Sequence, residues 1–141
     1  IARRQRQMCI RDSATALADP VNPVTAQYHL AFVASDTFYE HTHRYPGQRH
    51  DWQADVDPLL SHAQTYCARI GLDLSDSDRV RLQHACYELT RGAHSDTPST
   101  AAYLGGVAAQ EVIKILTVQY IPLDNTCVYD GIVQAVSSFR L

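Results

Sequence analysis

A few histidines, a cysteine and one acid–base pair are the residues of this chain that could carry chemistry. His41 and His43 stand two residues apart, as do His84 and Cys86. Side chains two apart diverge on a helix, so the two histidines could share a metal ion only in an extended segment. No orienting acid accompanies His84, which argues against a thiolate activated at Cys86. We therefore expect a solvated helix end at the histidines and a buried structural thiol at Cys86.

Glu111 and Lys114 lie three residues apart, which is the spacing of neighbours on one helix face. We expect them to form a surface or interface ion pair rather than an acid–base couple. The Gly105-Gly106 pair lies inside an apolar helical stretch and not after a strand, so no phosphate-binding loop is predicted. The sequence thus predicts no catalytic, cofactor-binding or metal site in this chain.

Composition limits the class of protein. With 141 residues, 45% of them hydrophobic and 19% charged, the chain is one globular domain or a piece of one. A net charge of −3 and the lack of a basic stripe argue against a nucleic-acid partner. No apolar run reaches the roughly 18 residues of a membrane span, and no signal peptide is evident. Four widely spaced cysteines without a C-x-x-C pair favour a reducing, intracellular compartment.

The first thirteen residues, with four arginines and no periodicity, differ from the remainder. Residues 8–13, Met-Cys-Ile-Arg-Asp-Ser, resemble the translation of a transposon adapter used in sequencing libraries. A phosphate-binding basic arm or plain disorder would also fit this composition. We interpret residues 1–13 as an artefact or a disordered segment, and the chain as a fragment cut on its N-terminal side.

A helical region is predicted for residues 14–95. Its first helix opens at Asn22-Pro23 and runs to about His43, where Tyr45-Pro46-Gly47 breaks it. One face of this helix carries an aromatic stripe with two aliphatic neighbours, and we expect this face to pack in the hydrophobic core. The residues are Tyr28, Leu30, Phe32, Val33, Phe38 and Tyr39.

Two further helices follow in this region. Apolar spacing from Trp52 to Ile70 predicts the second, in which Pro58 either causes a kink or stands first after a cap at Asp57. A capping box from Ser75 to Asp78 opens the third, which runs from about Asp76 to Arg91. Its expected buried residues are Val80, Ala85, Cys86 and Leu89.

Residues 97–120 form the stretch around which the rest is organised. Thr97 and Pro98 predict a helix start, and the body is almost entirely apolar or small. Each helix-interior glycine costs about 0.8–1 kcal/mol relative to alanine, so Gly105 and Gly106 indicate that another backbone comes close. We expect a buried helix with a close-packing or partner-interface face. Its candidate residues are Ala101, Gly105, Gly106, Ala109, Gln110 and Val112.

The chain ends with a predicted β-hairpin. Residues 125–129 and 132–139 are rich in valine and aromatic residues, and Asp130-Gly131 between them is a hairpin turn signal. The fold class is therefore α+β: a mainly helical segment, a long buried helix and a C-terminal hairpin.

The C-terminal residues also resemble a known family. Residues 101–114, Ala-Ala-Tyr-Leu-Gly-Gly-Val-Ala-Ala-Gln-Glu-Val-Ile-Lys, followed by Ile121-Pro122, Asn125-Thr126, Tyr129 and Gly131, resemble the C-terminal end of activating enzymes for ubiquitin-like modifiers. Arg44-Tyr45-Pro46-Gly47 narrows the resemblance to the regulatory, non-catalytic subunits of neddylation-activating enzymes. The resemblance extends over residues 22–141.

This resemblance has implications for fold and function. It implies that residues 96–141 end a Rossmann-like, ThiF-type pseudo-adenylation domain. The subunit would pair with a catalytic subunit that uses ATP and magnesium to activate the modifier, in the cytoplasm and nucleus. The alternatives are the matching half of a ubiquitin- or SUMO-activating enzyme, against which Arg44-Tyr45-Pro46-Gly47 argues, and a helical interaction module without an enzyme partner.

Overall fold

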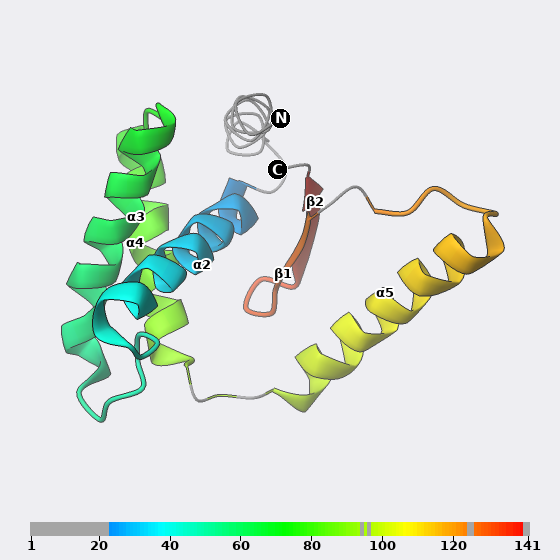
Figure 1. The fold of residues 1–141 in the computed structure, drawn as a ribbon, viewed down its shortest axis with the longest axis horizontal. Helices are drawn as coiled ribbons and strands as arrows, with labels where there is room; N and C mark the ends of the chain where they lie inside the picture. The colour runs from blue at the N-terminus through cyan, green and yellow to red at the C-terminus, as the bar shows by residue number, and fades with distance from the viewer. Residues whose placement is uncertain (1–22, 94, 96, 124–125, 140–141) are drawn as a thin grey trace.

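The computed structural model describes residues 23–93, 95, 97–123 and 126–139. The elements are the helices α2 (Pro23–Thr42), η1 (Trp52–Asp55), α3 (Val56–Ile70), α4 (Asp76–Arg91) and α5 (Pro98–Thr117), followed by the strands β1 (Thr126–Asp130) and β2 (Ala135–Phe139). Figure 1 shows α2, α3 and α4 packed together, with α5 apart from them and the hairpin between α2 and α5. The predicted α+β class, with a C-terminal hairpin, is confirmed.

The core lies between α2, α3 and α4. Each of these helices contacts the other two, and apolar side chains from all three fill the space between them. The buried cluster consists of Leu30, Ala31, Ala34, Phe38, Leu59, Ala63, Cys67, Leu72, Leu82, Ala85 and Cys86. Burying apolar surface at about 25 cal/mol per Å² makes this cluster the main source of stability for the three helices.

The aromatic stripe predicted on α2 is only partly buried. Leu30 and Phe38 are in the core and Tyr28 packs at its edge, whereas Phe32 and Tyr39 are exposed. On α4, Ala85 and Cys86 are buried as expected, but Val80 is exposed. Leu82 takes the core position because it is separated from Cys86 by four residues, which places both on one helix face.

The second predicted helix begins differently from either expectation. A short 3-10 turn, η1, precedes α3, and Pro58 is the third residue of α3. The first four N–H groups of a helix have no intrahelical acceptor, so a proline here neither kinks the helix nor needs a cap at Asp57. The predicted end is confirmed: Gly71 has φ +71°, and the Leu72 N–H donates to the Cys67 carbonyl at 2.9 Å.

The helices α4 and α2 match their predicted ranges. In α4, the Ser75 hydroxyl accepts a hydrogen bond from the Asp78 N–H at 3.2 Å, as a capping box requires. The helix α2 begins at Pro23, as the proline signature predicted. Its predicted cap, Asn22, lies outside the described residues.

The predicted helix over residues 97–120 forms as α5, but it is not buried in this chain. None of its residues is buried, and its side chains are exposed around most of its circumference. Apolar composition buries a helix only when other elements cover it, and the described residues do not cover α5. The Thr97 side chain makes no capping hydrogen bond either, although the helix begins at Pro98 as predicted.

The hairpin pairs β1 with β2 in antiparallel register from Thr126 opposite Phe139 to Asp130 opposite Ala135. Residues 131–134 connect the strands, so the turn is longer than the predicted Asp130-Gly131 pair. Asp130 is buried, and its Oδ1 accepts hydrogen bonds from the Ile132 N–H at 2.8 Å and the Val133 N–H at 3.4 Å. This carboxylate organises the connection.

Candidate interaction surface

The six predicted interface residues of α5 are all exposed. They are Ala101, Gly105, Gly106, Ala109, Gln110 and Val112. Apart from the adjacent residues and the backbone of its own helical turns, a β-carbon built on Gly105 or Gly106 would meet no heavy atom within 4 Å. The described residues therefore provide no close-packed neighbour for either glycine, and a contact at this face remains a prediction about a partner or another part of a longer chain.

Large apolar side chains extend this exposed surface toward the C-terminal end of α5 and beyond it. The most exposed on the helix is Leu116, at 77%. The exposed large apolar residues from this part of the chain are Tyr103, Leu104, Val112, Ile113, Ile115, Leu116, Val118, Tyr120 and Ile121. Exposed apolar side chains in this number are typical of an interaction site.

Two contacts connect α5 to the segments that follow it. The rings of Tyr103 and Tyr129 lie 4.7 Å apart, which links α5 to β1. Glu111 pairs with Lys114 at 2.7 Å and also accepts a hydrogen bond from the Leu123 N–H at 2.7 Å. The hydrogen bond from Lys114, followed by that from Leu123, lowers the pKa of Glu111. The predicted Glu111–Lys114 ion pair is thus confirmed, and the second carboxylate oxygen of Glu111 binds the segment that follows α5.

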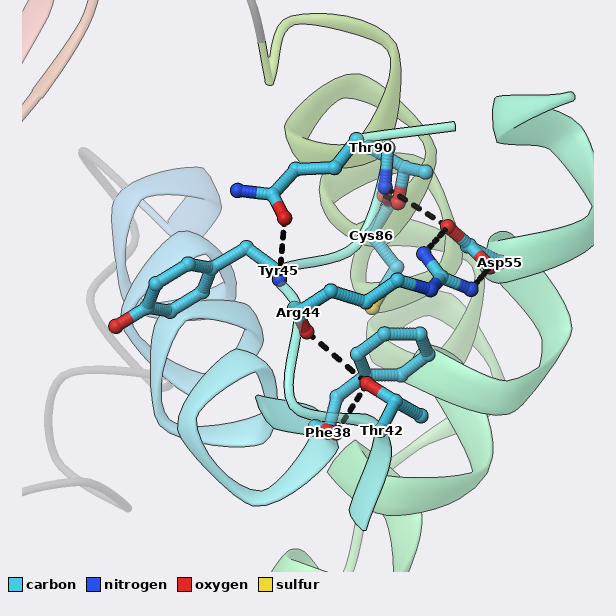
Figure 2. Close-up of polar contacts among 9 residues, drawn as sticks. Phe38, Thr42, Arg44, Tyr45, Asp55, Cys86 and Thr90 are labelled. Carbon is cyan, nitrogen blue, oxygen red and sulfur yellow. Dashed lines mark hydrogen bonds and ion pairs between the residues drawn. The ribbon is translucent and has the colours of Figure 1, made fainter. Parts of the chain in front are cut away.

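The loop after α2 contains a polar contact that the sequence did not reveal. Arg44 forms a two-pronged ion pair with Asp55, at 2.5 Å from Nη1 to Oδ2 and 2.6 Å from Nη2 to Oδ1. Figure 2 shows the guanidinium extending toward Asp55 beside the Phe38 ring, whose centroid lies 5.1 Å from the Arg44 Cζ. The Asp55 Oδ2 also accepts from the Gly47 N–H at 3.0 Å. Planar guanidinium–carboxylate pairs of this type fix geometry as well as charge.

Burial and charge act in opposite directions on Asp55. The side chain is buried, which by itself raises the pKa of a carboxyl, but the hydrogen bond from Arg44 outweighs this effect and the pKa is lowered. Asp55 is therefore ionised. Its position carried one usable sequence signal, since it falls on the apolar stripe between Trp52 and Leu59 where a solvated aspartate would not be expected.

The cysteine and histidine side chains considered for catalysis or metal binding show no sign of either role in the described residues. Cys67 and Cys86 are buried, and burial raises their thiol pKa values to about 11 and about 12, so both thiols stay protonated at neutral pH. His41 and His43 are exposed at the end of α2, as predicted. Across the described part of the chain, no three His, Cys, Asp or Glu side chains are grouped as metal ligands require. No described helix combines the length and apolarity needed to cross a membrane.

Known proteins with similar sequences are activating enzymes. The NEDD8-activating enzyme E1 regulatory subunit of Gallus gallus is 32% identical over 114 residues, which is 80% of this chain and 20% of that protein. The corresponding subunit of Drosophila melanogaster is 33% identical over 114 residues, 81% of this chain and 21% of that protein. Ubiquitin-activating enzyme E1 1 of Schizosaccharomyces pombe is 29% identical over 116 residues, 82% of this chain and 11% of that protein. No protein-family model matches the chain.

All three of these relatives are E1 activating enzymes or subunits of such enzymes. Within this class, the chain is homologous to a segment of the NEDD8-activating enzyme E1 regulatory subunits, which confirms the resemblance seen in the sequence. The chain spans about a fifth of the length of these subunits.

Proposed function

We propose that this chain is part of the regulatory, non-catalytic subunit of a NEDD8-activating enzyme. In that role it supports ATP-dependent activation of the ubiquitin-like modifier by a catalytic subunit, which supplies the ATP and magnesium site. The similarity to regulatory subunits from chicken and fruit fly supports this assignment. The subunit would form a heterodimer with the catalytic subunit, and the complex would act on the modifier in the cytoplasm and nucleus.

The structural observation that carries the proposal is the exposure of α5. A 20-residue helix without a buried residue, flanked by exposed Val118 and Ile121, is unfavourable in water unless another surface covers it. The matching relatives are about five times longer than the aligned segment, so the rest of such a subunit, or its catalytic partner, supplies surface of sufficient size. We therefore assign α5 and the hairpin to the assembly surface and α2–α4 to a supporting helical unit.

A segment exchange tests this function. Residues 22–141 would replace the matching segment of the chicken regulatory subunit, and the chimera would be co-expressed with the catalytic subunit. We expect co-purification and ATP-dependent thioester formation with NEDD8. Leu82→Asp, in the core, should abolish both, whereas Val80→Asp on the exposed face of the same helix should preserve both. A folded chimera that neither assembles nor forms the thioester would contradict the proposal.

A second candidate is a helical interaction module without an enzyme partner. The observation that favours it is the closed core of α2, α3 and α4, which requires no contribution from α5. In the same chimera assay, ubiquitin and SUMO replace NEDD8 to test whether the chain belongs to a ubiquitin- or SUMO-activating enzyme instead. Failure with all three modifiers, despite a folded chimera, would favour the module.

A further inference from the structure

A cavity of about 330 Å³ lies between α2, the loop that follows it and the last turn of α4. Phe32 and Asp36 come from α2, Tyr45 and Pro46 from the loop, and Leu89 from α4. The volume is at the lower end of the range typical of ligand pockets, about 300–1,000 Å³. This cavity is separate from α5 and from the surface assigned to assembly above.

Two exposed aromatic side chains line the cavity. Phe32 is 51% exposed and Tyr45 is 45% exposed, although both are large apolar side chains. Tyr45 also stacks on Tyr39, with 4.8 Å between ring centroids and 29° between ring planes, and Tyr39 is 43% exposed. Aromatic side chains that remain exposed around a hollow favour binding, because covering them with a ligand removes apolar surface from water.

The wall formed by Tyr45 and Pro46 is held in place from behind. Arg44 pairs with Asp55, and Figure 2 shows its side chain and that of Tyr45 leaving the loop in opposite directions. The Tyr45 N–H donates to Gln48 Oε1 at 3.1 Å, and the Gly47 N–H donates to Asp55. A wall ordered before binding reduces the entropy cost of binding.

Charge at the cavity has one sign. Asp36 is the one ionisable carboxylate among the lining residues, and Glu40 lies exposed four residues further along α2. Arg44, which precedes the lining residue Tyr45, is already paired with Asp55. The Ser35 hydroxyl is likewise engaged, since it donates to the Phe32 carbonyl at 2.7 Å. The cavity thus combines an apolar hollow with a free acidic rim.

We propose that this cavity binds a short peptide segment of a partner protein. One aliphatic or aromatic side chain of the peptide fills the hollow, and a neighbouring lysine or arginine pairs with Asp36. In such a complex the apolar hollow would contribute affinity, and the charge pair with Asp36 would contribute specificity. This activity does not depend on the proposed role in modifier activation.

A displayed library of random 12-residue peptides, selected on the full chain, tests the proposal. We expect enriched peptides to share an apolar residue next to lysine or arginine. Synthetic versions, measured by fluorescence anisotropy, should bind about fivefold or more weakly to Asp36→Lys and to Phe32→Ala. Asp73→Lys and Val80→Ala are the matched controls, since both residues are exposed and neither lines the cavity.

Several results would overturn the proposal. These are the absence of any enriched peptide, enriched peptides without a cation, and binding that the cavity variants and the controls weaken equally. Self-association of the chain that persists in Phe32→Ala and blocks peptide binding would assign the surface to a second copy instead. Thermal melts of all variants keep the result interpretable, and if Phe32→Ala unfolds, the charge reversal at the exposed Asp36 decides.

Discussion

The main-chain carbonyl oxygen of Thr90 lies 2.1 Å from the position that a β-carbon on Gly47 would occupy. Thr90 is buried near the end of α4, and Gly47, with φ +83°, belongs to the loop after α2. Only glycine satisfies both constraints, because it has no β-carbon and adopts positive φ without strain. The loop can therefore pack closely against α4 only because residue 47 has no side chain.

Replacement of Gly47 by alanine should destabilise the chain by more than about 2 kcal/mol, since backbone strain and a steric clash add together. Gly71→Ala is the matched control. Gly71 also has positive φ, +71°, but a β-carbon there meets nothing within 4 Å. Its cost should be limited to the strain of about 1–2 kcal/mol. Urea unfolding of both variants measures the difference, and equal losses would contradict the steric argument.

The Arg44–Asp55 pair predicts a specific pH dependence. The pKa of Asp55 lies below its ordinary value of 3.8 in the folded chain, chiefly through the hydrogen bond from Arg44. Its stabilising contribution is therefore fully present above about 3.8 and is lost as the pH falls through the lower, folded value. Asp55→Asn should cost about 2–4 kcal/mol at pH 7, because Arg44 remains without its charged partner.

This difference between wild type and Asp55→Asn should shrink as the pH falls below 4. Urea unfolding at pH 7, 5, 4 and 3 measures it. Asp57→Asn is the control, because Asp57 is exposed on the following turn and its substitution should leave the profile unchanged. A difference that does not vary with pH would mean that the ionised carboxylate is not what stabilises the loop.

Local sequence rules predicted the helices well, because capping and chain reversal depend on neighbouring residues. Ser75 and Gly71 acted as the patterns indicated. The Arg44–Asp55 pair could not be predicted in the same way, since it joins residues eleven apart that only the packing of the loop brings together. The role of Asp130 was missed for a related reason: its buried carboxylate replaces a tight two-residue turn with backbone hydrogen bonds.

The exposure of α5 shows a further limit of sequence reasoning. The helix forms from Pro98 as the sequence predicted, but the predicted burial is not seen, because apolar composition does not specify which elements cover a helix or whether they lie in the same chain. The same limit applies to α2, where Phe32 reads as core and is half exposed beside the cavity.

The chain by itself should not activate a modifier. No phosphate-binding glycine loop is present in the sequence, and the buried thiols Cys67 and Cys86 stay protonated. ATP–pyrophosphate exchange with the purified chain and NEDD8, ubiquitin or SUMO should remain at background. The assembled activating enzyme serves as the positive control, and modifier-dependent exchange by the chain alone would refute this expectation.

The purified chain should bind a hydrophobic dye through α5. Leu116→Lys and Ile115→Lys should reduce dye fluorescence without lowering the melting temperature, since both side chains are exposed and absent from the core. Leu82→Lys is the opposite control: it inserts a charge into the core and should unfold the three helices. A cooperative melt with no dye binding in the unmodified chain would show that α5 is covered in solution.

Substitutions of Gly105 and Gly106 should have different effects in the isolated chain and in an assembled subunit. A β-carbon at either position meets open space here, so Gly105→Ala and Gly106→Ala should each favour the helix by about 0.8–1 kcal/mol and raise the helical circular dichroism signal. We predict that a partner backbone approaches this face in the chimeric subunit. Because consecutive helix residues point about 100° apart, the two positions should then differ.

We expect Gly105→Leu to weaken co-purification with the catalytic subunit or to lower the melting temperature of the chimera, because over-packing costs about 1–3 kcal/mol. Gly106→Ala should have a milder effect, since Gly105 shares the small-residue face with Ala101 and Ala109. Gln119→Leu is the control, because Gln119 lies beyond the end of α5. Lys114→Leu is unsuitable because it removes the ion pair with Glu111. Unchanged assembly and stability with Gly105→Leu would show that no neighbouring backbone packs against this face.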